Sequence, residues 1–204
     1  MSGAASPQSS LSPALRSLRL TGMLETLETR LAEARSGRLG HVEFLQVLLE
    51  DEIARREAAG VARRLRAARF PTETTFEGFD YSYNPKLPQA QIRDLARLEF
   101  IGAGEGLICY GPVGVGKSHV ACAIGHLACR RGYDVLFTTA SRLFAELAGG
   151  HADRSFDQRL KKLAKVGVLV VDDFAMRELT ASQADDFYEL ISERIGRPPG
   201  LRLT

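Results

Sequence analysis

The residues with the clearest chemical meaning lie in a glycine-rich segment near the middle of the chain. Eight consecutive residues match the pattern G-x-x-x-x-G-K-[ST] without a gap: Gly111, Pro112, Val113, Gly114, Val115, Gly116, Lys117 and Ser118. Glycines at these places let successive backbone N–H groups turn inward around phosphate oxygens. We expect Lys117 to reach the β- and γ-phosphates and the Ser118 hydroxyl to ligate Mg²⁺. The segment therefore predicts an ATP-binding phosphate loop.

Two acidic residues follow a short apolar run further along the chain. The run Val166–Val171 predicts a buried strand, and Asp172 and Asp173 come directly after it. A carboxylate at the carboxyl end of a strand beside the phosphate-loop strand can hold the water shell of Mg²⁺, a role that suits Asp172. The second acid can polarise the attacking water. Such a pair is often only a turn, but beside an intact phosphate loop we predict a metal role for Asp172 and catalytic roles for Asp173 and Lys117.

Strands and helices must alternate around these residues to bring them together. We expect strands at Gly106–Tyr110, Asp134–Thr138 and Val166–Val171. We expect helices at Ser118–Arg131, Ser141–Leu147 capped by Ser141, Ser155–Lys165, and a last one that ends at Ile195 after a capping box of Thr180 and Gln183. The pattern predicts an α/β fold, with a parallel sheet covered by helices.

The first third of the chain predicts an all-helical module. After a flexible lead at residues 1–11, a helical run starts at Ser12-Pro13, and a second run extends from His41 to Phe70. The second run is expected to carry one apolar face of Phe44, Leu45, Leu48, Leu49 and Ile53. We expect a helical module at 1–71, a linker at 72–88 with a helix at Gln89–Phe100 (together 72–105), and a phosphate-loop ATPase core at 106–204.

Six arginines gather near the end of the second helical run, against the single acid Glu57. They are Arg55, Arg56, Arg63, Arg64, Arg66 and Arg69. Such a stripe is an electrostatic footprint for nucleic acid or another polyanion. The alternative is a solvated helix face whose arginine stems cover apolar neighbours. Composition alone does not separate these two interpretations.

The overall composition indicates an ordinary globular protein. Hydrophobic residues make up 45% and charged residues 25%, with a formal net charge of +2. The three cysteines suit a reducing compartment and not a disulfide framework. No apolar run approaches the ~20 residues of a membrane helix, and the N-terminal residues lack the apolar core of a signal peptide. We expect a cytoplasmic protein with no membrane partner.

Two weaker groups of residues have alternative interpretations. Cys122, His126 and Cys129 share one face of the helix after the phosphate loop and imitate a zinc site. That helix should pack against the sheet and no fourth ligand is within reach, so buried packing residues are the favoured interpretation. The linker aromatics Phe79, Tyr81 and Tyr83 either wall an adenine pocket or pack on the following domain, and the sequence leaves both open.

Taken together, these segments make the chain resemble the IstB-like transposition helper ATPases, relatives of the DnaC helicase loaders in the AAA+ class. The resemblance rests on Leu18–Glu33, Arg63–Pro71, Phe79–Tyr81, Gln91–Leu95, the phosphate loop, Phe137–Ala140 and Val170–Phe174. It implies an AAA+ sheet with an all-helical N-terminal module. The cofactors it implies are ATP and Mg²⁺, and the implied partners are DNA, a transposase and further copies of the chain. It also favours DNA contact for the arginine stripe.

The resemblance is weakest at the C-terminal end. Family members continue past the helix that ends at Ile195 into a sensor strand, an arginine finger and a second sensor. In the family's strand order 5-1-4-3-2 the fourth strand lies between the phosphate-loop strand and the Asp172 strand. The chain is therefore expected to be C-terminally truncated relative to the family, or to use Leu201–Thr204 as a stub of that strand. On this basis we expect ATP binding without appreciable turnover by the chain as given.

Three functions remain in competition at this point. The leading hypothesis is a helper that binds and hydrolyses ATP, assembles on DNA and assists a transposase in insertion-sequence transposition. A DnaC-like replicative helicase loader differs from it only in its partner. The third is a truncated module that binds ATP and DNA without hydrolysis. An ATPase assay with and without DNA separates the third from the first.

Overall fold

The structure is a computed structural model of the chain, and it describes residues 7–203 apart from 79–81, 83, 85–86, 175, 177 and 196–200. For residues 7–10 and 201–203 it describes the backbone alone. The chain divides into two compact units, Met1–Ala62 and Arg63–Thr204. No helix in the described residues is long and apolar enough to cross a membrane.

The first unit consists of helices α1 (Pro7–Ser17) and α2 (Thr21–Arg35) and the first part of α3 (His41–Ala68). Its small core holds Met23, Leu27 and Leu48. Helix α1 begins at Pro7, and the expected start at Ser12-Pro13 is wrong because Pro13 lies inside the helix. Both prolines follow a serine, so the same signal for a helix start occurs twice and the sequence does not choose between them.

Helix α2 receives its N-terminal cap from another helix. Its own N-cap residue, Leu20, makes no capping bond. Instead the carboxylate of Glu52 on α3 accepts hydrogen bonds from the backbone N–H groups of Gly22 (2.6 Å) and Met23 (3.3 Å). A side chain at residue 22 would not fit, since a Cβ there would lie 2.8 Å from the Glu52 Cα. Glycine therefore lets the two helices approach closely enough for the cap to form.

Two arginines bind the other oxygen of the same carboxylate. The Glu52 Oε1 atom accepts from the Arg56 Nε (2.6 Å) and from an Arg55 Nη (3.3 Å). Burial by itself raises the pKa of Glu52, but the hydrogen bonds from Arg56, Arg55 and the two backbone N–H groups outweigh it and hold the pKa at about 2. Glu52 therefore stays ionised in the folded unit at neutral pH.

The apolar residues of α3 occupy two faces of the helix, and the prediction of one face is wrong. Phe44 and Leu48 pack with α2, whereas Leu45, Leu49 and Ile53 are 46% to 55% exposed. Successive residues turn by about 100° around a helix, so these two sets lie on different sides. The apolar run in the sequence is wider than the one face that the first unit buries.

The second unit is built on a parallel sheet of β1 (Leu107–Ile108), β2 (Val135–Thr139), β3 (Val168–Asp172) and β4 (Leu201–Leu203). The strand order is β1-β4-β3-β2. Leu107 pairs with Arg202 on one side of β4, and Leu169 pairs with Leu201 on the other. The expectation that the segment from Leu201 supplies the strand between β1 and β3 is confirmed for its first three residues.

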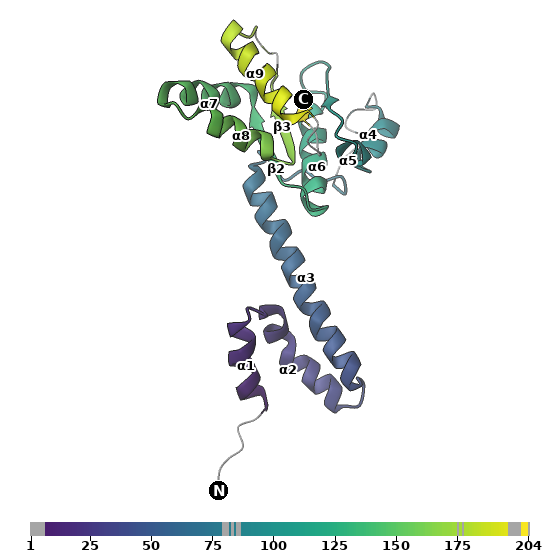
Figure 1. Cartoon of the computed structure of the whole chain (residues 1–204). Coiled ribbons are helices and arrows are strands. Elements are labelled where there is room, and N and C mark those ends of the chain that lie inside the picture. The colour runs from purple at the N-terminus through teal and green to yellow at the C-terminus, as the bar shows by residue number, and fades with distance from the viewer. Residues whose placement is uncertain are drawn as a thin grey trace. The chain divides into compact units, whose positions relative to one another are not determined.

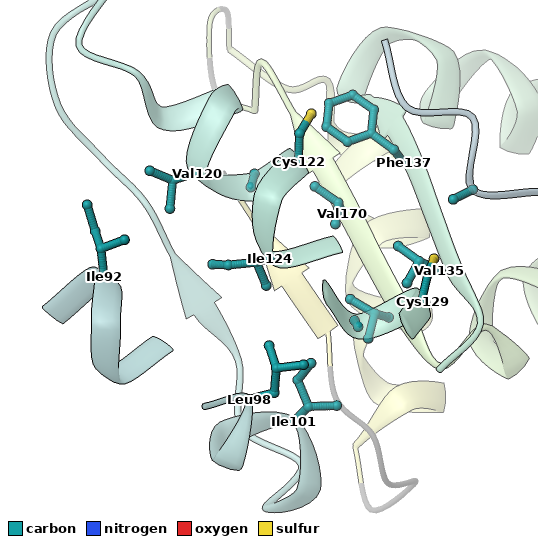
Figure 2. Close-up of a cluster of buried hydrophobic side chains, with 14 residues drawn as sticks. Ile92, Leu98, Ile101, Val120, Cys122, Ile124, Cys129, Val135, Phe137 and Val170 are labelled. Carbon is teal, nitrogen blue, oxygen red and sulfur yellow. The ribbon is translucent and has the colours of Figure 1, made fainter. Parts of the chain in front are cut away.

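Helices cover both faces of this sheet. One face carries α6 (Lys117–Arg130), with α4 (Gln89–Leu95) and α5 (Glu99–Gly102) beside it, and the other carries α7 (Ala140–Asp153), α8 (Phe156–Lys165) and α9 (Ala181–Arg194) (Figure 1). Val168 and Val170 point toward α6, and Leu169 and Val171 point to the opposite face. The cluster on the α6 side is drawn in Figure 2. The predicted parallel sheet covered by helices is confirmed.

Two local predictions about α7 are wrong. Its N-cap is Thr139 and not Ser141, because the Thr139 hydroxyl accepts from the Arg142 N–H. The helix also runs through Gly149 and Gly150 to Asp153. A Cβ at Gly150 would lie 2.8 Å from the Phe156 Cα, so this glycine serves the close contact of α7 with α8 and does not end the helix. The capping box of Thr180 and Gln183 is confirmed.

The helix expected at Gln89–Phe100 is interrupted. Helix α4 ends at Leu95 and α5 begins at Glu99, and the backbone of Leu98 between them is left-handed, with φ of 61°. The Leu98 side chain is only 5% exposed. Burial of this leucine therefore accompanies a turn that periodicity alone does not reveal.

Helix α6 is held in place by the last turns of α3 and by the segment that follows them. The Phe70 ring lies on Gly125 and against the His126 ring, with ring centroids 4.4 Å apart and the ring planes tilted by 30°. At the other end, the Arg64 Nε donates to the backbone carbonyl of Cys129 at 2.8 Å. That carbonyl is among the last four of α6, which have no partner within the helix. Arg64 and Phe70 thus fix the helix that starts at the phosphate loop.

The network around Glu52 predicts a specific pH dependence of stability. Its pKa is about 2 when folded against 4.5 for the free group, so its contribution is fully present above about pH 4.5 and is lost as the pH falls toward 2. Glu52→Gln should lower the melting temperature of the helical signal at pH 7, and the gap to the wild type should close between pH 4.5 and 2. Thermal unfolding followed by circular dichroism measures this. Glu50→Gln on the exposed side of α3 is the control, and an equal effect there would contradict the assignment.

The contact between Phe70 and Gly125 predicts an unusual cost for a Gly→Ala change inside a helix. An alanine Cβ at residue 125 would lie 2.5 Å from the Phe70 ring, so we expect a net loss of about 1 kcal/mol, since overpacking of about 1–3 kcal/mol exceeds the gain in helix propensity. Urea unfolding measures it. Gly102→Ala, which meets nothing within 4 Å, is the matched control and should not destabilise. In a Phe70→Leu background the cost at residue 125 should shrink, and an unchanged cost would exclude the ring as its cause.

Candidate nucleotide-binding site

The phosphate loop (Gly111–Ser118) joins β1 to α6, as the sequence predicts. All three of its glycines have positive φ: Gly111 (149°), Gly114 (81°) and Gly116 (99°). Residues with a Cβ adopt these conformations only with strain. Gly116 is the N-cap of α6, so the first N–H groups of that helix open onto the loop. An anion placed there meets unpaired N–H donors and the positive end of the helix dipole.

The Lys117 side chain folds back over the loop. Its Nζ donates to the backbone carbonyls of Gly111 (3.1 Å) and Pro112 (2.9 Å). The ammonium group is therefore already held above the cradle of N–H groups. A phosphate oxygen carries a negative charge and is a stronger acceptor than a neutral carbonyl, so a bound phosphate can draw this group toward it.

Asp172 and Asp173 lie at the carboxyl end of β3. Asp172 pairs with Thr139 across the sheet, and the Asp173 N–H donates to the Asp172 Oδ1 at 3.0 Å. Asp173 has φ of 54°, which turns the chain sharply out of the strand. Carboxyl ends of parallel strands meet at one edge of the sheet, where such folds bind ligands.

A single cavity of about 920 Å³ collects these residues. Its walls include every phosphate-loop residue except Pro112, together with Asp172 and Asp173. The volume is within the usual range for sites that bury a ligand of nucleotide size. The structure thus brings together the phosphate loop and the two acids, which the sequence could only associate by motif. The cavity also offers the hydroxyl and carboxylate oxygens that Mg²⁺ prefers, from Ser118 and Asp172.

One wall of the cavity comes from the linker, a possibility that the sequence left open. Thr74, Gly78 and Leu87 of the linker line it, and the Asn84 side chain donates to the backbone carbonyl of Val115 at 3.3 Å. The linker shows no periodicity, so the sequence did not decide whether it lies against the phosphate loop. The proposed adenine-wall residues Phe79, Tyr81 and Tyr83 lie outside the described residues.

Other residues that the sequence analysis did not single out also line the cavity. They are Cys109, Tyr110, His119, Phe174 and Met176. Three of them directly adjoin the predicted site residues in sequence, so proximity to the motif could have identified Tyr110, His119 and Phe174. Tyr110 and Met176 are 91% and 71% exposed and leave an apolar rim around the opening.

The cysteines and histidine of α6 are packing residues, as favoured from the sequence. Cys122 and Cys129 are 1% and 0% exposed and belong to the cluster between α6 and the sheet (Figure 2). Burial raises the pKa of Cys129 to about 11 and also raises that of Cys122, so both thiols stay protonated at neutral pH. Burial lowers the pKa of His126, whose ring lies against Phe70. These groups fill space around α6.

The six arginines of the stripe do not behave alike. Arg55 and Arg56 bind Glu52 in the first unit, and Arg64 binds the Cys129 carbonyl in the second. The exposed members in the second unit are Arg63, Arg66 and Arg69. Half of the stripe thus has a structural role, which the sequence left open as the alternative to nucleic-acid contact.

Comparison with known proteins places these features in a family. The model of the IstB-like ATP-binding proteins matches residues 13–199. An ATP-binding protein of an insertion sequence from Mycobacterium tuberculosis is 60% identical over 187 residues, which are 91% of this chain and 74% of that protein. The ATP-binding protein of insertion sequence IS1162 from Pseudomonas fluorescens is 36% identical, with 89% of this chain and 79% of the relative covered.

Solved structures share the fold. The DnaC helicase loader has a TM-score of 0.55 at 24% identity, covering 68% of this chain and 79% of that one. DnaA from Aquifex aeolicus, bound to AMPPCP, has a TM-score of 0.57 at 18% identity over 67% of this chain. The chain spans 43% of the length of that DnaA structure. The likeness to both identifies an AAA+-like α/β fold. Because the family model matches residues 13–199 of this chain and a relative is 60% identical, the chain belongs to the IstB-like ATP-binding proteins of insertion sequences.

Proposed function

We propose that this protein binds ATP with Mg²⁺ in the 920 Å³ cavity and acts as the ATP-dependent helper of a transposase on DNA. The observation that carries the proposal is the meeting of the phosphate loop with Asp172 and Asp173 in one cavity at the carboxyl edge of the sheet. A glycine-rich turn with no ligand would not need two acids and an apolar linker wall around the same space.

The chain's own groups divide the work of holding the nucleotide. The N–H groups at Gly114–Ser118 surround the phosphates, and Lys117 exchanges its carbonyl partners for the β- and γ-phosphate oxygens. Ser118 and Asp172 hold Mg²⁺, Asp172 partly through water. The ion, when bound, neutralises charge on the phosphate oxygens. The linker wall of Thr74, Gly78 and Leu87 faces the rest of the nucleotide.

Asp173 is placed to act on water instead of on the metal. It follows Asp172 at the cavity wall and is exposed, and the left-handed backbone at this residue turns the chain out of the strand. A carboxylate beside the phosphate site can orient a water molecule and accept its proton. A steady-state ATPase assay with and without DNA distinguishes a hydrolysing helper from an ATP-gated module that binds without turnover.

The insertion-sequence role rests on the relatives and on the helical unit. The family model begins at residue 13, so it includes α2 and α3 and not only the ATPase core. This extent favours a transposition helper over a replicative helicase loader, with which the chain shares the fold. Exposed Arg63, Arg66 and Arg69 supply sequence-independent contacts to DNA phosphates. Assembly of several copies on DNA completes the proposed role.

Nucleotide binding should depend on Lys117 and turnover on Asp173. Lys117→Ala removes a charge-assisted contact worth about 1.5–3 kcal/mol, so affinity for Mg·ATP should fall by at least about tenfold in isothermal titration. Asp173→Asn should leave that affinity within about twofold and lower any turnover by about 10²–10⁴-fold. Lys161→Gln, which removes a lysine on the distant helix α8, is the control. Full affinity in Lys117→Ala would place the phosphates elsewhere.

DNA binding should depend on the exposed arginines and be weakly sequence-specific. Each phosphate contact contributes about 0.9 to the slope of log affinity against log salt, so Arg63→Gln/Arg66→Gln should lower the slope by about 1.8. Fluorescence anisotropy on labelled duplexes of two unrelated sequences measures both slope and specificity. Lys161→Gln/Lys162→Gln removes equal charge from α8 and should leave the slope unchanged. Equal slopes in the wild type and the arginine variant would show that these arginines form only a solvated helix face and do not contact DNA phosphates.

A further inference from the structure

An apolar stripe on α3 is left uncovered by the first unit. Its members are Val42, Leu45, Leu49 and Ile53, which are 80%, 55%, 46% and 55% exposed. At about 100° per residue they fall within roughly 80° of arc and extend about 17 Å along the helix. Single exposed leucines are ordinary, but a contiguous stripe over three turns is typical of an interaction surface.

The fold does not account for the stripe. Helix α3 packs on α2 through Phe44 and Leu48, which lie about 120° around the helix from the centre of the stripe. The core of the first unit is complete without it, since Met23, Leu27 and Leu48 are each at most 7% exposed. The four exposed side chains are not members of this core.

A column of acids runs along one edge of the stripe. Glu43, Glu50 and Glu57 recur every seven residues, are all exposed, and follow the stripe for about 21 Å. Their recorded hydrogen bonds are with neutral groups: Glu43 accepts from the Gly40 N–H, and Glu50 accepts from the Gln46 side chain. Within the described part of the chain none of the three forms an ion pair with an arginine of α3.

We propose that the stripe is the docking site for an amphipathic helix of another protein, with an apolar ridge flanked on one side by lysine or arginine. Apolar anchors at i, i+3, i+7 and i+11 are the pattern by which one helix recognises another. The glutamate column selects a basic flank, because opposite charges beside an apolar seam set the choice and orientation of partners. The column's length corresponds to about four helical turns in the partner.

A second copy of this chain fits the surface less well. In a two-fold antiparallel pair of α3 stripes, the same edge of each helix faces its counterpart, so the two glutamate columns would lie together. Like charges in that arrangement oppose association. In a parallel pair the column would face the side of α3 that already packs on α2. A partner of different sequence and opposite charge avoids both conflicts.

A designed peptide tests the proposal on the whole 204-residue chain. The probe is a labelled 21-residue helical peptide with leucine at positions a and d of three heptads and lysine at positions e and g. The control peptide has glutamate in place of each lysine. In anisotropy measurements the lysine peptide should bind and the glutamate peptide should bind at least about tenfold more weakly. Leu45→Gln/Leu49→Gln should abolish binding, and Glu50→Gln/Glu57→Gln should weaken it several-fold and reduce its dependence on salt. Leu18→Gln removes a residue that is 66% exposed outside α3 and should change nothing.

Other outcomes overturn the proposal. Failure of the lysine peptide to bind, equal binding of the two peptides, or indifference to the stripe variant excludes a basic amphipathic partner. If the lysine peptide does not bind, and sedimentation shows a wild-type dimer that Leu45→Gln/Leu49→Gln dissociates, then the stripe is the interface with a second copy of the chain. Affinity for Mg·ATP is measured in every variant and should stay constant. Loss of peptide binding and failure of the proposed ATP site can therefore be told apart.

Discussion

The turn from β1 into α6 depends on positive φ at Gly111, Gly114 and Gly116, and the rest of the second unit is arranged around it. The turn leaves the first N–H groups of α6 unpaired at the cavity, which is useful only if the helix itself is rigidly held. Nine residues of α6 are buried, from Val120 to Cys129. Phe70 covers Gly125, and Arg64 occupies a carbonyl at the far end. A preorganised phosphate cradle thus rests on contacts that lie well away from the phosphates.

What the sequence could predict follows from how local the signal is. The phosphate loop, α6 and the capping box at Thr180 are written in consecutive residues, and the structure has them where expected. The observed ends of strands β2 and β3 differ by one or two residues from the predicted ends. An apolar run does not show at which residue the hydrogen bonding between neighbouring strands stops. The position of Leu201–Leu203 between β1 and β3 was available only through a family's strand order.

The predictions that failed needed information from distant residues. Gly149 and Gly150 look like a helix end until Phe156 and Arg159 are known to pack against them. The two apolar faces of α3 cannot be told apart without knowing that α2 covers only one. The linker wall of the cavity has no periodicity at all, and its place is fixed by contacts such as that of Asn84 with the Val115 carbonyl. The site was therefore predictable on its phosphate side and not on its opposite side.

Several arginines of this chain bind backbone carbonyls at helix ends, a structural role that the number of charges in the sequence does not reveal. Arg194 is 3% exposed and donates to the carbonyls of Leu163, Ala164, Val166 and Gly167 where α8 ends. Arg64 does the same for α6, and Arg159 donates to the Glu146 carbonyl beside its ion pair with Asp153. A guanidinium group has five donors in a fixed plane and can satisfy several carbonyls that a helix end leaves unpaired. A run of arginines therefore overstates the charge that faces solvent, and only the exposed members can contribute to the binding of a polyanion.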